Sequence, residues 1–470
     1  MAKFYLTTSI AYVNGAPHIG HTLEFVQADA FVRWRRSEGD TAYFLTGTDE
    51  HGAKIARAAE AEGVTPQALT DRNSARFRAL KESLSLSWDE FIRTTDRERH
   101  WPNVEKVWRA LVAKGDIYTK TYKGLYCVGH EAFVTEKDLE NGICRDHNAA
   151  PEAIEEENYF FRLSKYAAEV KKRIESGELK IVPHGRAKEI VNFIDQGIED
   201  ISFSRPRKDL SWGIPVPGDD AQTIYVWCDA LVNYLAPGEW WPADVHMIGK
   251  DILRFHALYW PAMLLSADLP LPKALFVHGH ITSGGQKMSK TLGNVADPAD
   301  LVARYGTDPV RYYLLREIPP TDDGDFSEEK FLERYEGDLA NGLGNFSARV
   351  TALSKRVGAE RVENPEEGVK EAIAAARSGI KEKMGEYRFH EALATLWELI
   401  AFGNRYVNEH KPWDKEVPEA EAKAAIGNAL AILAEVATLL MPFMPGTAEK
   451  IMNGEAAMLF PRMAPIAGKA

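Results

Sequence analysis

Two histidines near the N-terminus are spaced so that both could bind one anion. His18 and His21 flank Gly20 and lie between a predicted strand at 3–9 and the helix predicted after it. Residues three apart lie on one face of a helix, and backbone N–H groups at a helix N-terminus stabilise anions. Gly20 has no side chain and would let a nucleotide approach the backbone. The spacing by itself fits two surface histidines equally well.

A second cluster of charge, Lys287-Met288-Ser289-Lys290, follows a Gly-Gly pair at 284–285. Two lysines on a glycine-rich loop can close over a polyphosphate and neutralise the charge that develops in a transition state. Most segments of this kind are solvated charged loops, so this pattern alone does not define a site.

Two Cys/His doublets predict a metal site. Cys127 pairs with His130 and Cys144 with His147, each with two intervening residues, and a spacer of 13 residues separates the doublets. This donor set and spacing suit one tetrahedral Zn²⁺. The alternative is a metal-free knuckle in which both thiols are buried. Cys228 has no ligand partner in sequence and is expected to pack in a core.

Composition limits the class of protein. The chain has 470 residues, of which 45% are hydrophobic, so we expect about three domains. Its net charge of −12 argues against non-specific coating of nucleic acid but allows a local basic site. The most apolar stretch, 429–444, contains Glu435 and is predicted to be a buried helix, not a membrane span. No secretion signal is recognisable, which favours a cytoplasmic protein.

The elements that would position these residues alternate between strand and helix. Strands are predicted at 3–9 and 41–46, each followed by a helix, and at 245–249 and 274–277, with a helix from about 253 between them. This order predicts an α/β fold with a doubly wound, Rossmann-like parallel sheet. Residues 117–222 interrupt it as an insertion. Amphipathic stretches at 367–385, 388–409 and 417–441 predict a C-terminal α-helical bundle.

Together and in this order, the two motifs resemble the HIGH and KMSKS signatures of class I aminoacyl-tRNA synthetases. Within that class the chain is similar to the methionyl-tRNA synthetase family from Phe4 to about residue 450. Four further segments carry the resemblance: Thr46–Gly52 (TGTDEHG), Trp212–Pro217 (WGIPVP), Tyr225–Ala230 (YVWCDA) and Ile248–His256 (IGKDILRFH).

The resemblance implies that ATP, with Mg²⁺, and L-methionine form methionyl-adenylate, which then esterifies initiator and elongator tRNA(Met). It assigns catalysis to His18, His21, Lys287 and Lys290. It assigns ATP binding to the same four residues with Gly20, Asp251 and Met288. The implied methionine site has Asp49 at the amino group and a side-chain wall of Ile10, Tyr12, Trp227, Ala230, Leu231, Tyr234, Ile252 and His256.

The resemblance also implies that the helical domain reads a CAU anticodon. Unpaired bases are read by stacking on aromatic rings and by polar contacts to their edges. Trp413 lies just after a helix that ends before Pro412, and by resemblance it carries the anticodon contact. Asn341 and Asn345 lie four apart on one predicted helix face, with Arg349 four further on. The alternatives are core packing for Trp413 and helix–helix packing for the asparagines.

The resemblance divides the chain into five segments: a catalytic α/β domain at 1–116 and 223–272, a connective insertion with the metal knuckle at 117–222, a KMSKS region at 273–337, and an anticodon-binding domain at 338–470. We expect a monomer. Two other functions remain open at this point. One is a small-molecule nucleotidylyltransferase that uses the HxGH motif, and the other is a catalytically inactive tRNA-binding homologue.

Overall fold

The computed structural model describes residues 2–128, 132–134, 139–145, 149–287 and 296–463. Within them, seven strands form one parallel sheet in the order β10-β16-β15-β1-β3-β2, with β4 also paired to β3. The bounds of these strands are β1 Lys3–Thr8, β2 Ala11–Tyr12, β3 Thr41–Asp49, β4 Glu90–Arg93, β10 Lys180–Val182, β15 Val245–Gly249 and β16 Ala274–His278. The predicted parallel α/β sheet is confirmed.

The central strands are buried along their whole length, which explains their apolar sequences. All five residues of β15 and of β16 are buried, as expected for a parallel sheet covered on both faces. From β1 the chain continues to β3 on one side of the sheet, whereas β15 pairs with β1 on the other side. Ligands of such sheets bind where the strand order reverses, at the carboxyl ends of the strands. Here that position follows β1 and β15.

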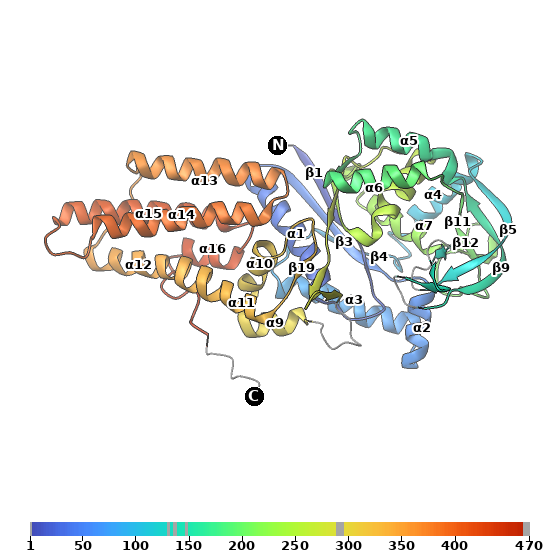
Figure 1. Cartoon of the computed structure of the whole chain (residues 1–470), viewed down its shortest axis with the longest axis horizontal. Helices are drawn as coiled ribbons and strands as arrows, with labels where there is room; N and C mark the ends of the chain where they lie inside the picture. Colours follow the sequence, from blue (N-terminus) through green and yellow to red (C-terminus); the bar gives the residue numbers. More distant parts are fainter. Residues whose placement is uncertain (1, 129–131, 135–138, 146–148, 288–295, 464–470) are drawn as a thin grey trace. The chain divides into compact units, whose positions relative to one another are not determined.

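The insertion contributes a strand to the main sheet, which the sequence did not predict. Its long strands, β5 (Ile117–Cys127) and β9 (Glu152–Phe161), are antiparallel (Figure 1). Helices α5 (Leu163–Glu175) and α6 (His184–Asp195) follow, and between them β10 pairs in parallel with β16. A strand of three residues between two helices is too short to give a period-two pattern.

The remaining elements of the insertion and the second half of the sheet domain are short. They are β6 Ala132–Val134, β7 Leu139–Glu140, β8 Ile143–Cys144, β11 Ile201–Ser202, β12 Ser204–Pro206, β13 Pro215–Val216, β14 Asp219–Ile224, α7 Val226–Leu231, η2 Val232–Leu235 and η3 Gly238–Trp240. The helix predicted from about 253 is broken. It consists of η4 (Lys250–Ile252), the π-helical η5 (Phe255–Tyr259) and α8 (Trp260–Ser266).

Internal contacts divide the chain into two compact units. The first comprises Met1–Pro17, Asp40–Lys81 and Trp88–His278, and so contains the sheet and the insertion. Its remaining helices are α2 Ala53–Glu62, α3 Pro66–Ser83 and α4 Trp101–Ala113. The second unit comprises His18–Gly39, Glu82–Ser87 and Gly279–Ala470.

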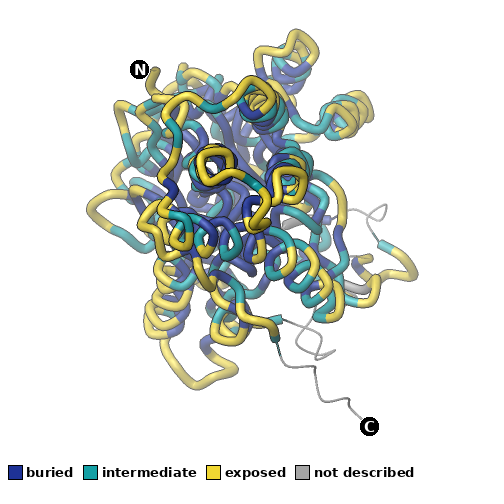
Figure 2. The backbone as a smooth tube through the Cα atoms, turned by 90° about the vertical axis from the view of Figure 1, so that its left-hand side faces the viewer, coloured by how far each residue is buried: buried dark blue, intermediate teal, exposed yellow. Residues whose placement is uncertain are grey.

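Long antiparallel helices dominate the second unit. Helices α13, α14 and α15 lie side by side in Figure 1, and Figure 2 shows the buried and exposed residues along the backbone of the whole chain. The helices from residue 298 on are α9 Pro298–Tyr305, α10 Thr307–Arg316, α11 Glu328–Arg334, η7 Tyr335–Gly344, α12 Asn345–Val357, α13 Glu367–Gly385, α14 Phe389–His410, α15 Glu419–Leu440 and α16 Pro445–Met452. The predicted bundle is confirmed, with each of its three predicted helices ending within two residues of the expected bounds.

Helix α15 is long and apolar enough to cross a membrane by length and composition, but 67% of its most apolar window is buried within the protein. It therefore has the character of a core helix, as the sequence predicted.

A buried ion pair ties α1 (Ile19–Ser37) to the C-terminal helices of the second unit. Arg311 on α10 lies 2.8 Å from Asp29 on α1, and both side chains are fully buried. Arg311 also donates to the backbone carbonyls of Phe443 and Pro442, just after α15. Breaking a buried pair leaves an uncompensated charge, so this contact fixes α1 firmly.

Candidate active site and anticodon interface

The two histidines of the first motif cap helix α1. His18 is the N-cap residue, and its Nδ1 accepts a hydrogen bond from the backbone N–H of Gly20 at 3.1 Å. His21 Nδ1 accepts from the backbone N–H of His18 at 3.3 Å, and the two ring centroids are 3.9 Å apart. A neutral imidazole that accepts at Nδ1 carries its proton on Nε2. Both rings therefore carry their proton on Nε2 at a helix N-terminus, and N–H groups at such a position suit a phosphate oxygen.

Gly20 is required by this cap. A Cβ at Gly20 would lie 2.9 Å from Cε1 of the His18 ring, closer than side-chain contacts allow. The glycine therefore makes room for the His18 ring to fold back over the helix N-terminus. Its predicted second role, close approach of a nucleotide to the backbone, stays a prediction.

The predicted lysine loop begins on a tight hairpin. Strands β17 (Ile281–Ser283) and β18 (Gln286–Lys287) are joined through Gly284 and Gly285, which have φ of +61° and +73°. Two successive positive φ values define a turn that favours glycine strongly. The N–H of Gly285 donates to Asp325 at 2.9 Å. Lys287 closes β18, while Met288 and Lys290 lie outside the described residues.

In the first unit, the predicted methionine wall forms part of one hydrophobic cluster. Its members from the predicted site are Ile10, Tyr12, Trp227, Leu231, Tyr234 and Ile252. The Trp227 ring is stacked on Phe255, with centroids 3.5 Å apart. Ala230 is buried on the same helix, α7, as Trp227. Asp251, predicted to bind ATP, is exposed just after β15, where the strand order reverses.

Tyr234 and His256 form the polar part of this wall, and the direction of the hydrogen bond between them can be assigned. His256 Nδ1 lies 3.0 Å from the carbonyl oxygen of Ile252, which can only accept, so Nδ1 carries the proton. Burial lowers the pKa of His256 to about 4, so the ring is neutral at pH 7. Its Nε2 is then an acceptor and accepts a hydrogen bond from the Tyr234 hydroxyl, with 2.7 Å between Nε2 and the hydroxyl oxygen.

The carboxylate predicted to bind the amino group lies at the end of β3. Asp49 is 5% exposed, and its backbone carbonyl accepts from the N–H of Val13 at 3.2 Å. The segment after it is held by its backbone carbonyls. Tyr12 donates to the carbonyl of His51 at 2.7 Å, and Trp212 Nε1 donates to that of Glu50 at 2.6 Å. The sequence predicted a role for Asp49 but not these hydrogen bonds, because their donors come from distant segments.

Two of the four predicted zinc ligands lie together. Cys127, at the end of β5, and Cys144, at the end of β8, are 2% and 0% exposed and belong to one small hydrophobic cluster. His130 and His147 lie outside the described residues. Among the described residues no group of three or more His, Cys, Asp or Glu is placed to hold a metal. Cys228 packs in the main core as expected, and burial raises the pKa of its thiol well above the ordinary value.

The predicted anticodon residues lie at the surface of the second unit. Trp413 is 39% exposed and follows the end of α14, with the Arg349 guanidinium 4.5 Å from its ring centroid. Asn341 and Asn345 are also exposed, so neither is a helix-packing residue. They do not share a regular α-helical face, because Asn341 is in the π-helical η7 and Asn345 begins α12.

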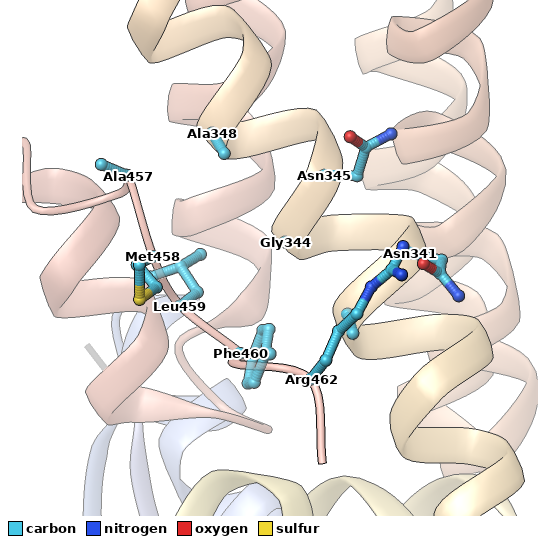
Figure 3. Close-up of a pocket in the computed structure, with 10 residues that line it drawn as sticks. Asn341, Gly344, Asn345, Ala348, Ala457, Met458, Leu459, Phe460 and Arg462 are labelled. Atoms are coloured by element: carbon cyan, nitrogen blue, oxygen red, sulfur yellow. The ribbon is translucent and has the colours of Figure 1, made fainter. Parts of the chain in front are cut away.

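Both asparagines nevertheless line one cavity of about 340 Å³ (Figure 3). Its other wall comes from the C-terminal segment, where Phe460 and Arg462 contribute, and the Arg462 side chain extends toward Asn341. Sequence reasoning missed Arg462. Arg462 belongs to no helix. It lines the cavity only because the segment after α16 folds back against η7 and α12.

The chain matches two families of protein domains. Residues 4–144 and 134–351 match the family described as tRNA synthetases class I (M), and residues 371–465 match the anticodon-binding domain of tRNA ligase. It is 42% identical to the methionine--tRNA ligase of Brucella suis over 96% of this chain and 91% of that protein. It is 44% identical to the methionine--tRNA ligase of Clostridium acetobutylicum over 96% of this chain and 72% of that protein.

Solved structures agree with this assignment. The chain is similar to Mycobacterium tuberculosis methionyl-tRNA synthetase in complex with methionyl-adenylate, with a TM-score of 0.91, 38% identity, and coverage of 96% of this chain and 94% of that one. The apo form of the same enzyme gives a TM-score of 0.85 at 33% identity, with 99% of each chain covered. The chain therefore belongs to the methionyl-tRNA synthetase family of class I tRNA synthetases.

Proposed function

We propose that His18 and His21, together with Lys287 and Lys290, carry the adenylation step of this family's reaction. The enzyme is a methionine--tRNA ligase: it activates L-methionine with ATP and charges tRNA. The geometry of the α1 cap supports the proposal most directly, because two Nε2–H donors lie beside a helix N-terminus. Donors placed in advance at a phosphate cost no reorganisation when charge develops on it.

The chemistry needs no side-chain nucleophile. An oxygen of the methionine carboxylate attacks the α-phosphorus of ATP, and the bond from that phosphorus to the pyrophosphate oxygen breaks. The products are methionyl-adenylate and pyrophosphate, and a tRNA hydroxyl then displaces AMP. Catalysis therefore consists of positioning and of stabilising charge on the departing pyrophosphate, which we assign to the two lysines. Mg²⁺ bound with ATP would neutralise part of the phosphate charge.

The methionine site lies in the first unit. Asp49 binds the ammonium group, and the wall that contains Trp227 and Tyr234 surrounds the thioether. Aromatic rings suit a polarizable sulfur. The Tyr234–His256 hydrogen bond supports this assignment, because it holds the tyrosine hydroxyl in one orientation within an otherwise apolar wall. Asp251, exposed after β15, is assigned to the ATP ribose.

The anticodon interface lies in the second unit, with Trp413 as the stacking platform and Arg349, Asn341 and Asn345 as polar contacts. The exposure of Trp413, Asn341 and Asn345 supports this role, and Arg349 lies against the Trp413 ring. We add Arg462 to this set because it lines the same cavity as the asparagines. Initiator and elongator tRNA(Met) carry the same anticodon, so one interface would serve both.

We further propose one Zn²⁺ held by Cys127, His130, Cys144 and His147. Two buried thiols in one small cluster suit such a donor set, and the metal would stabilise the insertion rather than enter the reaction. A monomer acting in the cytoplasm completes the proposal, and light scattering near 52.5 kDa tests its oligomeric part.

Methionine-dependent exchange of labelled pyrophosphate into ATP tests the adenylation site. Lys290→Ala should lower the exchange rate far more than it weakens methionine binding, because the charge that the lysine meets grows only in the transition state. Equal losses in both would indicate a ground-state binding role instead. Absence of methionine-dependent exchange in the unmodified protein would contradict the assignment as a whole.

A further inference from the structure

A buried carboxylate joins three segments of the first unit. Asp229 lies on α7, and its two oxygens each accept a hydrogen bond of 2.6 Å, one from His51 Nδ1 and one from His100 Nε2. The three side chains are at most 3% exposed. A carboxylate only accepts, so the ring nitrogen that faces it carries the proton in both histidines.

The charge state of this group follows from its partners. Burial alone would raise the pKa of Asp229, but the neighbouring His51 and hydrogen bonds from both rings hold it below the ordinary value. The carboxyl is therefore ionised at neutral pH. Within the described residues, His100 Nδ1 is buried without a hydrogen-bond partner, so Nε2 makes the one polar contact of this ring, to Asp229. An asparagine could not reproduce this arrangement, because its N–H₂ end would face one of the two ring N–H groups.

The carboxylate links the two segments that carry the proposed methionine site. His51 follows Asp49 by two residues, in the segment that Tyr12 also holds through the carbonyl of His51. Asp229 itself lies next to Ala230 and two residues after Trp227. The bond from Asp229 to His51 therefore connects the segment that binds the ammonium group to the helix that forms the thioether wall.

We propose that Asp229 is a positioning residue for methionine, which holds the Asp49 segment at a fixed spacing from α7. The role rests on the proposed function, in which Asp49 and α7 contact opposite ends of the same amino acid. Both contacts reach full strength only when their spacing matches the ligand. Loss of the link would leave each contact intact but let their separation vary.

The test is a comparison of two ligands in Asp229→Asn. We expect the KM for methionine to rise about 10-fold or more, while the KM for ATP stays within about twofold. The inhibition constant of 4-(methylthio)butanoate, which lacks the ammonium group, should also stay within about twofold, because this ligand uses only one of the two contacts. His51→Ala breaks the same link from the other side and should give the same split if Asp229→Asn does not fold.

Asp116→Asn is the matched control, since Asp116 is another buried carboxylate, with Lys165, Tyr166 and Ser266 as partners. It should lower the melting temperature without changing the KM for methionine. If Asp229→Asn behaves like this control, or weakens both ligands equally, Asp229 is merely structural and the proposal is overturned. Asp49→Asn tests the proposed methionine site separately from the role of Asp229. An unchanged KM for methionine in Asp49→Asn would refute the site itself, and with it the role of Asp229.

Discussion

Replacing Trp413 with alanine should separate tRNA charging from amino acid activation. Trp413 is 39% exposed, and the Arg349 guanidinium lies 4.5 Å from its ring centroid. A cation–π contact at an exposed site contributes about 0.5–1 kcal/mol, so the loss of stability should be near 1 kcal/mol or less. Stacking of an unpaired base on an aromatic ring is worth about 1–3 kcal/mol. We therefore expect kcat/KM for tRNA to fall about 5- to 150-fold.

The assay compares three measurements on Trp413→Ala: aminoacylation of tRNA, methionine-dependent pyrophosphate exchange, and the melting temperature. Only the first should change substantially. Trp397→Ala is the matched control, because Trp397 is partly buried and donates to the carbonyl of Asp338 at 3.1 Å. That variant should lose stability. A fall in melting temperature as large as the control's, or a parallel loss of both activities, would show that Trp413 is a structural residue and would refute its role in binding the anticodon.

Three further outcomes follow from burial, space and donor chemistry. Burial lowers the pKa of His256 to about 4 and shifts that of His246 in the same direction. The unfolded chain therefore binds more protons between pH 6.5 and 4, and stability is full above pH 6.5 and falls below it. Urea titrations at pH 7.5 and 5 should show a loss of about 2 kcal/mol for His256 alone, and His256→Gln should reduce this difference. In Gly47→Ala the new Cβ would lie 2.1 Å from a backbone oxygen of β4, so thermal melts should show a loss of about 3 kcal/mol or more; Gly185→Ala, with nothing within 4 Å, should lose none. Metal analysis of protein purified without chelator should find about one zinc per chain and none in Cys127→Ser, and under about half an equivalent in the unmodified protein would count against the site.

Local sequence patterns determined the secondary structure and the family. Strand and helix periodicity placed β15 and α13 at their observed bounds, because a buried strand and an amphipathic helix each carry their signal within a few residues. The HxGH and KMSK motifs identified the family for a similar reason. In the HxGH motif the helix cap sets the geometry of both histidine side chains, and a glycine turn at 284–285 directly precedes the segment that contains the KMSK motif.

Only the tertiary structure decided which distant residues meet. β10 gave no pattern of its own and becomes a sheet strand because β16 offers it an edge. Arg462 reaches the asparagine cavity by the return of the chain, and Asp229 meets His51 and His100 across 178 and 129 residues of sequence. Contacts of this kind depend on how separate elements pack, and packing leaves no periodic trace in the sequence around any one of the residues involved.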